Sequence, residues 1–148
     1  MIFLHGTSQV ILVLSKKDKT ILSMEFNPNN NVIQLCIQGM GKEENGLPAE
    51  AAALFMKAWN EATNDFEKFI AAHYIARHQH NAADRLTWYQ TALQHALSVN
   101  NESVTGAYAT LHTNIAKCYQ EMGDAGNATR HEALAVALTH NPADKGPF

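Results

Sequence analysis

The sequence predicts an all-α protein built from three antiparallel helical hairpins packed in a row. Three observations lead to this fold class. From Asn30 onward, apolar residues recur at a helical spacing. A set of small and aromatic residues returns further along the chain, which is typical of repeat architectures. Finally, 148 residues with 46% hydrophobic side chains are enough for one folded domain with its own core.

The first hairpin begins near Asn30 and continues past "ENGLP" into a second helix. Pro48 lies just inside the second start, a favoured first-turn position. The spacings i, i+3, i+4 and i+7 place the apolar residues of each helix on one face. In the first helix these are Val32, Leu35, Cys36, Gly39 and Met40, and in the second Ala51, Leu54, Phe55, Ala58, Trp59 and Ala62.

Four more helices complete the other two hairpins. Asp65 is the predicted N-cap of the third helix, and Asn81 with Asp84 form a predicted capping pair for the fourth. A long fifth helix is predicted from Val104 to Met122. Gly123 is placed to end it in a left-handed turn. The sixth helix is predicted over residues 125–139.

A common register relates the hairpins. Successive members of a five-residue set lie seven, five, four and three residues apart, and the set occurs three times. The second set begins 34 residues after the first, and the lengthened stretch "SVNNESVTG" precedes the third. The three sets are Gly39, Gly46, Ala51, Phe55 and Ala58; His73, His80, Arg85, Tyr89 and Ala92; and Ala116, Gly123, Ala128, Glu132 and Ala135.

The stretches "GMGKEENGLPAEAAALFMKAW" and "NIAKCYQEMGDAGNA" resemble tetratricopeptide repeats, whose period is about 34 residues. The resemblance implies a right-handed solenoid over residues 28–142, in which the first helices of the hairpins line a concave groove. The middle hairpin departs from the pattern at His73, His80 and Arg85, so a more open or bent arrangement is expected there. The chaperone-tail clamp of some family members is not expected, because Cys36 and Met40 occupy its lysine and asparagine places.

The groove positions carried over from the family predict a surface for a protein or peptide partner. Tyr74 and Arg77 share a helix face and are residue types enriched at binding hot spots. Arg77 and Lys117 could instead pair with Glu44 or Glu121. The groove lining comprises Ile33, Cys36, Met40, Glu43, Glu44, Glu67, Ile70, Tyr74, Arg77, His78, Thr113, Lys117, Gln120 and Glu121. The partner-binding set chosen from it is Met40, Glu44, Ile70, Tyr74, Arg77, His78, Lys117 and Gln120.

Residues 1–27 form an extension before this domain, and residues 143–148 form a tail. Two short β-branched runs around "KKDK" could make a small hairpin. Alternatively, Met24 is the natural start and the preceding residues do not belong to the native protein. The apolar run at residues 10–14 is too short to span a bilayer, and no signal peptide is predicted.

Composition and motifs argue against several function classes. A formal net charge of −3 with mixed signs gives no basic stripe for nucleic acid. His73 and His80 are two helical turns apart, about 10 Å along the axis, which is too far for one metal ion. The glycines of "GKEENGLP" lack a following Lys-Ser or Lys-Thr pair. Cys36 and Cys118 lie among apolar residues, which makes a thiol unreactive. We expect both to be free thiols in a reducing compartment. A cytoplasmic protein without a cofactor, metal or membrane contact is expected.

Two alternatives to a binding module stay open: a small helical enzyme or nucleic-acid modifier, and a scaffold that self-assembles into a homodimer through the ends of the array. The stretch "WNEATNDFEKFIAAHYIARHQ" is similar to small bacterial proteins, some of which carry a ribosomal RNA adenine methyltransferase label. That label implies a glycine-rich turn in a Rossmann-like sheet and an Asn-Pro-Pro-aromatic motif. The chain has "NPNN" and "NPAD" instead, so its motifs do not support the label. A six-helix bundle without repeat geometry is the alternative fold.

Overall fold

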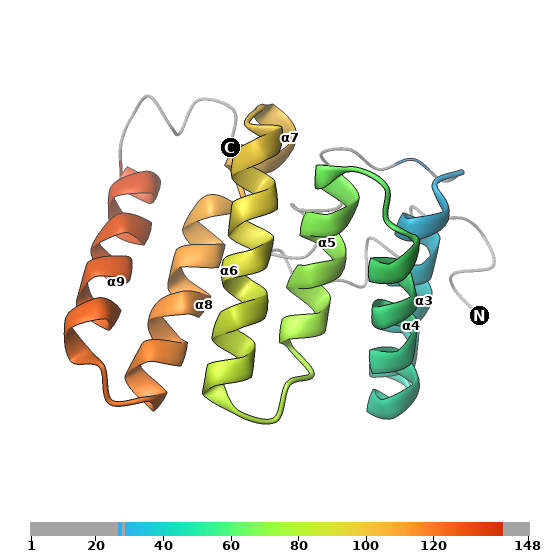
Figure 1. Cartoon of the computed structure of the whole chain (residues 1–148), viewed down its shortest axis with the longest axis horizontal. Helices are drawn as coiled ribbons and strands as arrows, with labels where there is room; N and C mark the ends of the chain where they lie inside the picture. The colour runs from blue at the N-terminus through green and yellow to red at the C-terminus, as the bar shows by residue number, and fades with distance from the viewer. Residues whose placement is uncertain (1–26, 28, 141–148) are drawn as a thin grey trace.

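The computed structural model describes residue 27 and residues 29–140, and this part of the chain is entirely helical (Figure 1). The predicted all-α class is therefore confirmed for these residues. The extension at residues 1–27 with its proposed β-hairpin lies outside the described residues, apart from Asn27. The tail at 143–148 also lies outside them.

The first helix pair is α3, Asn31–Glu44, and α4, Pro48–Glu61. Asn30 caps α3 by accepting a hydrogen bond from the Ile33 backbone N–H at 2.9 Å. Pro48 occupies the first turn of α4, as predicted. Between the two helices, Gly46 has a φ of +73°, which glycine adopts without the steric cost that a Cβ brings.

The second pair is α5, Asp65–Ala76, and α6, Ala82–Val99. The predicted cap Asp65 is wrong by one residue. Asn64 has the extended backbone of a cap, and its side chain accepts from the Glu67 N–H at 2.9 Å. The capping pair of α6 is confirmed, because Asn81 accepts from the Asp84 N–H at 2.8 Å.

The third part contains the single turn α7, Glu102–Thr105, followed by α8, Tyr108–Glu121, and α9, Ala125–His140. The predicted continuous helix from Val104 is thus wrong. Asn101 caps a separate turn by accepting from the Ser103 N–H at 2.8 Å, and this turn ends at Gly106. Gly123 follows α8 with a φ of +80°, so the predicted left-handed turn at the end of this helix is confirmed.

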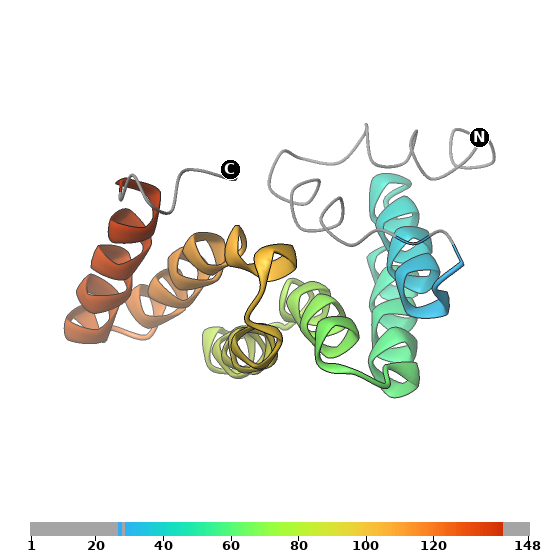
Figure 2. The same ribbon diagram turned by 90° about the horizontal axis from the view of Figure 1, so that it is seen from above.

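Consecutive helices lie side by side, and the three pairs α3–α4, α5–α6 and α8–α9 follow one another in a curved row (Figure 2). α5 packs against α3, α4 and α6, while α8 lies between α6 and α9. The core follows this row. Its largest fully buried side chains include Tyr74, Phe55, Phe69, Ile33, Ile70, Leu111 and Ile115.

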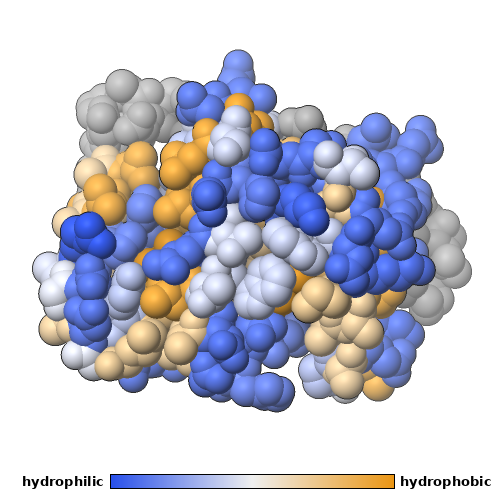
Figure 3. Space-filling model, in the orientation of Figure 1, coloured by the Kyte–Doolittle hydropathy of each residue, from blue (hydrophilic) through white to orange (hydrophobic). Residues whose placement is uncertain are grey.

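The last helix, α9, is far less buried than α5 in the middle of the row. Among the described side chains of α9, only Ala128 and Ala135 are buried, whereas Leu134 and Val136 are 42% and 55% exposed. Hydrophobic side chains gather over α8 and α9 on the face shown in Figure 3. Within residues 29–140, no helix combines the length and the apolar character needed to cross a bilayer.

Candidate functional site

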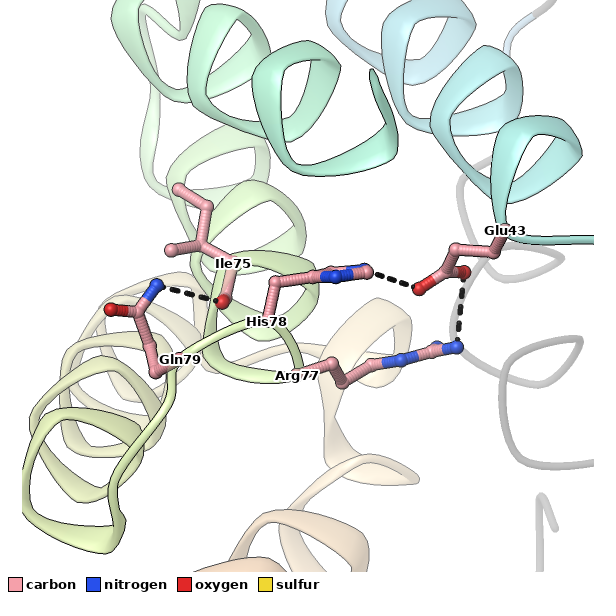
Figure 4. A network of polar contacts seen from close by, with 5 residues as sticks. All are labelled: Glu43, Ile75, Arg77, His78 and Gln79. Atoms are coloured by element: carbon pink, nitrogen blue, oxygen red, sulfur yellow. Dashed lines mark hydrogen bonds and ion pairs between the residues drawn. The ribbon is translucent and has the colours of Figure 1, made fainter. Parts of the chain in front are cut away.

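The candidate site lies where the C-terminal ends of α3 and α5 meet (Figure 4). Glu43, in the last turn of α3, receives two contacts from the end of α5. Arg77 donates from Nη2 to Glu43 Oε1 at 3.1 Å, and His78 Nε2 lies 2.6 Å from Glu43 Oε2. We call these three residues the α3–α5 junction. One carboxylate thus holds the ends of two neighbouring helices together.

Aromatic rings support the junction from the core side. The ring of Phe55 lies 5.1 Å from that of Tyr74, with planes 19° apart, and 5.5 Å from the imidazole of His78. The Arg77 guanidinium lies 5.1 Å from the Tyr74 ring centroid, within the range of a cation–π contact. The rings restrict both basic side chains, so less rotamer freedom is lost when a carboxylate binds.

Helix dipoles explain the signs of the charges. The C-terminus of a helix carries a partial negative charge, which favours cations in its last turn. Arg77 follows this rule at the end of α5, as does His78 in its protonated form. Glu43 does not follow it at the end of α3, and its side chain is only 19% exposed. The two basic groups therefore compensate a carboxylate that its own helix end and partial burial disfavour.

A second junction joins the second and third pairs. Arg85, near the start of α6, donates to the Gln79 carbonyl at 3.1 Å and pairs with Glu121 of α8 at 2.5 Å. Both junctions correct the pairing alternatives considered from the sequence. Arg77 pairs with Glu43 rather than Glu44, and Glu121 pairs with Arg85 rather than Lys117.

The predicted partner-binding residues fall into two groups. Ile70 and Tyr74 are fully buried and Met40 is 4% exposed, so these three belong to the core and offer no side-chain surface to a partner. The others reach the surface to different degrees. Glu44 and Lys117 are exposed, Arg77 and His78 form the α3–α5 junction, and Gln120 donates to Glu132 of α9 at 3.1 Å.

The structure brings Tyr74, Arg77 and His78 together, but it places Lys117 and Gln120 on α8, at a different part of the row. Sequence reasoning missed the roles of Phe55 and Arg85. The spacing of Phe55 predicts that it lies on the apolar face of α4, and nothing in that spacing indicates that its ring also contacts His78. The separation of 34 residues between Glu43 and Arg77 was a usable signal, because it equals the proposed repeat.

Neither cysteine is placed for nucleophilic chemistry. Cys36 is fully buried, and this burial raises the pKa of its thiol far above the usual range. Burial also raises the pKa of Cys118, although the neighbouring Arg85 opposes the shift. Thiols with raised pKa values are poor nucleophiles at neutral pH. Among the described residues, no three histidine, cysteine or acidic side chains are grouped to hold a metal ion.

A hollow of about 340 Å³ lies beside the N-terminal caps of α3 and α5, with Asn30, Asn64 and Glu67 in its lining. Glu67 is 9% exposed, and its carboxylate already accepts hydrogen bonds from Asn30 Nδ2 at 2.8 Å and the Thr63 N–H at 2.9 Å. Burial by itself would raise the pKa of Glu67, but these hydrogen bonds outweigh it and lower the pKa. The carboxylate therefore acts as an internal cap.

Comparison of the chain with protein-family models, with curated proteins and with solved structures finds no match.

Proposed function

We propose that this chain is a protein-interaction module of the tetratricopeptide type, in which three helix pairs stack as a right-handed solenoid. In this proposal a peptide or a helix of another protein binds at the surface residues of the first helices and their ends, Glu44 of α3, Arg77 after α5 and Lys117 of α8. The observation that carries the proposal is the α3–α5 junction, where residues one proposed repeat apart, Glu43 and Arg77, contact each other.

The seams between paired helices support the same repeat. A Cβ on Gly39 would lie 2.4 Å from Phe55 Cε1, so the small residue is needed for the ring to pack there. At the matching positions of the second pair, the His73 and Tyr89 rings are 6.2 Å apart. Equivalent positions therefore face each other in two successive pairs, as a stacked repeat requires.

The surface available for recognition is polar and of mixed charge. Glu44 and Lys117 are exposed, and the Arg77 side chain is 33% exposed beside the buried Tyr74 ring. Rigid, partly desolvated arginines beside aromatic rings are frequent anchors in protein interfaces. A partner with acidic side chains would complement Arg77 in the part of this surface near α5.

The test is an affinity capture from lysate of the source organism with the wild-type chain and an Arg77→Glu, Lys117→Glu variant. Lys57→Glu is the control, since it reverses one charge at an exposed position on α4, away from the proposed surface. We expect a protein that wild type and control retain and the double variant loses, with helicity by circular dichroism unchanged. Retention by all three would contradict the proposed surface.

Sedimentation of the purified chain separates this proposal from self-assembly. A binding module for another protein is expected to sediment as a monomer at all concentrations tested. A sedimentation coefficient that rises with concentration, together with an empty capture, would indicate the homodimeric scaffold instead.

A further inference from the structure

Two histidines join the last two helices of the described chain. His112 of α8 and His131 of α9 face each other, with their Nδ1 atoms 2.9 Å apart. Their ring centroids are 5.2 Å apart and their planes differ by 28°. A short distance between nitrogens combined with well-separated centroids means that the rings meet edge to edge. This is the geometry of an N–H···N hydrogen bond rather than of face-to-face stacking.

Such a bond fixes the protonation of the pair. One imidazole must donate its Nδ1 proton, and the other must offer the lone pair of Nδ1 and carry its own proton on Nε2. The donor ring can accept a further proton on its free Nε2 and keep the bond. The acceptor ring can accept one only at Nδ1, which would place two N–H groups head to head. The pair therefore tolerates one extra proton but not two.

The surroundings do not supply a charge that would favour the second proton. In residues 29–140, no carboxylate forms a hydrogen bond with either ring. Tyr119 of α8 lies nearly parallel to His131 at 5.6 Å, and its hydroxyl accepts from Gln90 of α6 at 3.3 Å. On α9, the cationic Arg130 disfavours a charge on His131, and the carboxylate of Glu132 accepts from Gln120 of α8 at 3.1 Å. The carboxylate of Glu121 on α8 is already paired with Arg85 of α6.

We propose that the His112–His131 pair is an acid-sensitive latch that holds α9 on α8 until the second imidazole of the pair is protonated. The latch adds to the Gln120–Glu132 hydrogen bond at 3.1 Å, and it matters because the helix α9 buries only small side chains among those described. Its two described buried side chains are alanines, Ala128 and Ala135, so each contributes little buried apolar area. Opening would uncover the face of α8 that α9 now covers, at the end of the row.

The direction of the pH effect follows from linkage. Burial lowers the pKa of His112, and a charge on His131 lowers it further; burial and then Arg130 lower the pKa of His131. With α9 released, both rings return towards their ordinary value near 6.5. The released state therefore binds more protons below this pH, and docking weakens as the pH falls. Because the two rings interact, the two protonation steps are properties of the pair and are not assigned to single rings.

The test is amide hydrogen exchange of the full chain, with protection factors of α9 divided by those of α4 between pH 7.5 and pH 5. We expect the ratio to fall below pH 6.5 by up to about tenfold per pH unit, the limit for one extra proton. His112→Gln and His131→Gln each put a polar group that cannot be charged in place of one ring, so each should weaken the pH dependence of the ratio. The double variant has no imidazole at the pair and should remove the dependence. His95→Gln is the matched control, because His95 pairs with Asp65 outside α8 and α9. A wild-type ratio without pH dependence would overturn the proposal.

Nitrogen-15 NMR spectra of the imidazoles of the wild-type chain test the shared proton directly, even if α9 is undocked in both glutamine variants. At neutral pH, one ring should carry its proton on Nδ1 and the other on Nε2, and acid should protonate them in two separate steps. Two Nε2–H rings that titrate together near pH 6.5 would overturn the latch.

Discussion

The first and last helix pairs follow the same register but fill the space between their helices differently. In the α3–α4 pair, the Phe55 ring packs against Gly39 and is fully buried. In the α8–α9 pair, Glu132 occupies the position that corresponds to Phe55 and is exposed, while small alanines are buried. A shared spacing therefore sets where helices lie, and the side-chain volumes decide how firmly they are held.

The helix between these two regions shows the same trend. Ten of the twelve residues of α5 are buried, whereas α9 exposes Leu134 and Val136. α5 has neighbours on three sides, and α9 packs on α8 at one end of the row. In the proposed repeat array, stability is a sum of local terms between neighbouring pairs. The end of this molecule should accordingly open before its centre.

The largest expected effect comes from replacing Phe55 by alanine. Loss of a buried phenylalanine costs about 3–5 kcal/mol of unfolding free energy. The corresponding replacement at the exposed end, Glu132→Ala, should stay within about 0.5 kcal/mol. Urea unfolding followed by circular dichroism measures both. Similar losses at the two positions would show that the first and last pairs are packed alike.

A glycine-to-alanine change tests the close contact in the first pair. In Gly39→Ala, the new Cβ would meet Phe55 Cε1 at 2.4 Å, so the ring must move. Overpacking of this kind costs about 1–3 kcal/mol. The second change Phe55→Leu should recover part of this loss, because it removes the atoms in conflict. Unfolding free energies of the two single variants and the double variant measure this recovery. Additive effects of the two changes would contradict the contact between Gly39 and Phe55.

Acid should weaken the joint between the first two pairs through Glu67, which accepts from Asn30 at the start of α3. Hydrogen bonds hold the pKa of Glu67 below its ordinary value of 4.5, despite the opposing effect of burial. The folded state thus binds fewer protons than the unfolded state. The resulting stabilisation is complete above pH 4.5 and is lost as the pH falls through the lowered pKa.

The measurement is urea unfolding of wild type and Glu67→Gln at several pH values from 7 to 3. At pH 7, the variant should be less stable by about 1–3 kcal/mol, the usual cost of disturbing a buried hydrogen-bonded group. The two curves should converge as the pH falls below 4.5. A constant difference over the whole range would show that ionisation of Glu67 does not matter.

The smallest effects are expected at the two junctions. Glu43→Gln and Glu121→Gln should each cost about 0.2–1 kcal/mol, because both pairs are partly solvated. Glu43 is 19% exposed and Glu121 is 55% exposed, so salt should screen the second pair more strongly. Unfolding in low and high sodium chloride checks this order. A stronger salt dependence for Glu43 would reverse the expected ranking.

Helix boundaries set by local signals could be predicted from the sequence. The cap at Asn81, the first-turn Pro48 and the stop at Gly123 depend on neighbouring residues alone, and all three are confirmed. The separate turn α7 could not be foreseen, since Val104 fits an apolar stripe whether or not the helix is broken near Gly106. Asn64 and Asp65 are both good capping residues, and only the backbone geometry decides between them.

The candidate site was harder to predict than the fold, because periodicity gives the face of a helix but not how deeply its neighbours cover it. Tyr74 shares a face with Arg77, yet its ring is fully buried while the arginine reaches the surface. The contact of Phe55 with His78 joins helices from different pairs, and such contacts depend on the angle between pairs. Nothing in a single sequence specifies that angle.

The chain has two tryptophans, and they meet at one place. Trp59 of α4 and Trp88 of α6 lie edge to face with ring centroids 5.1 Å apart, and Lys68 lies 4.0 Å above the Trp59 ring. The intrinsic fluorescence of this molecule is therefore a local optical signal for the contact between the first two helix pairs. It leaves the α8–α9 pair largely unseen. Emission and total helicity should follow different curves if the end of the row unravels first.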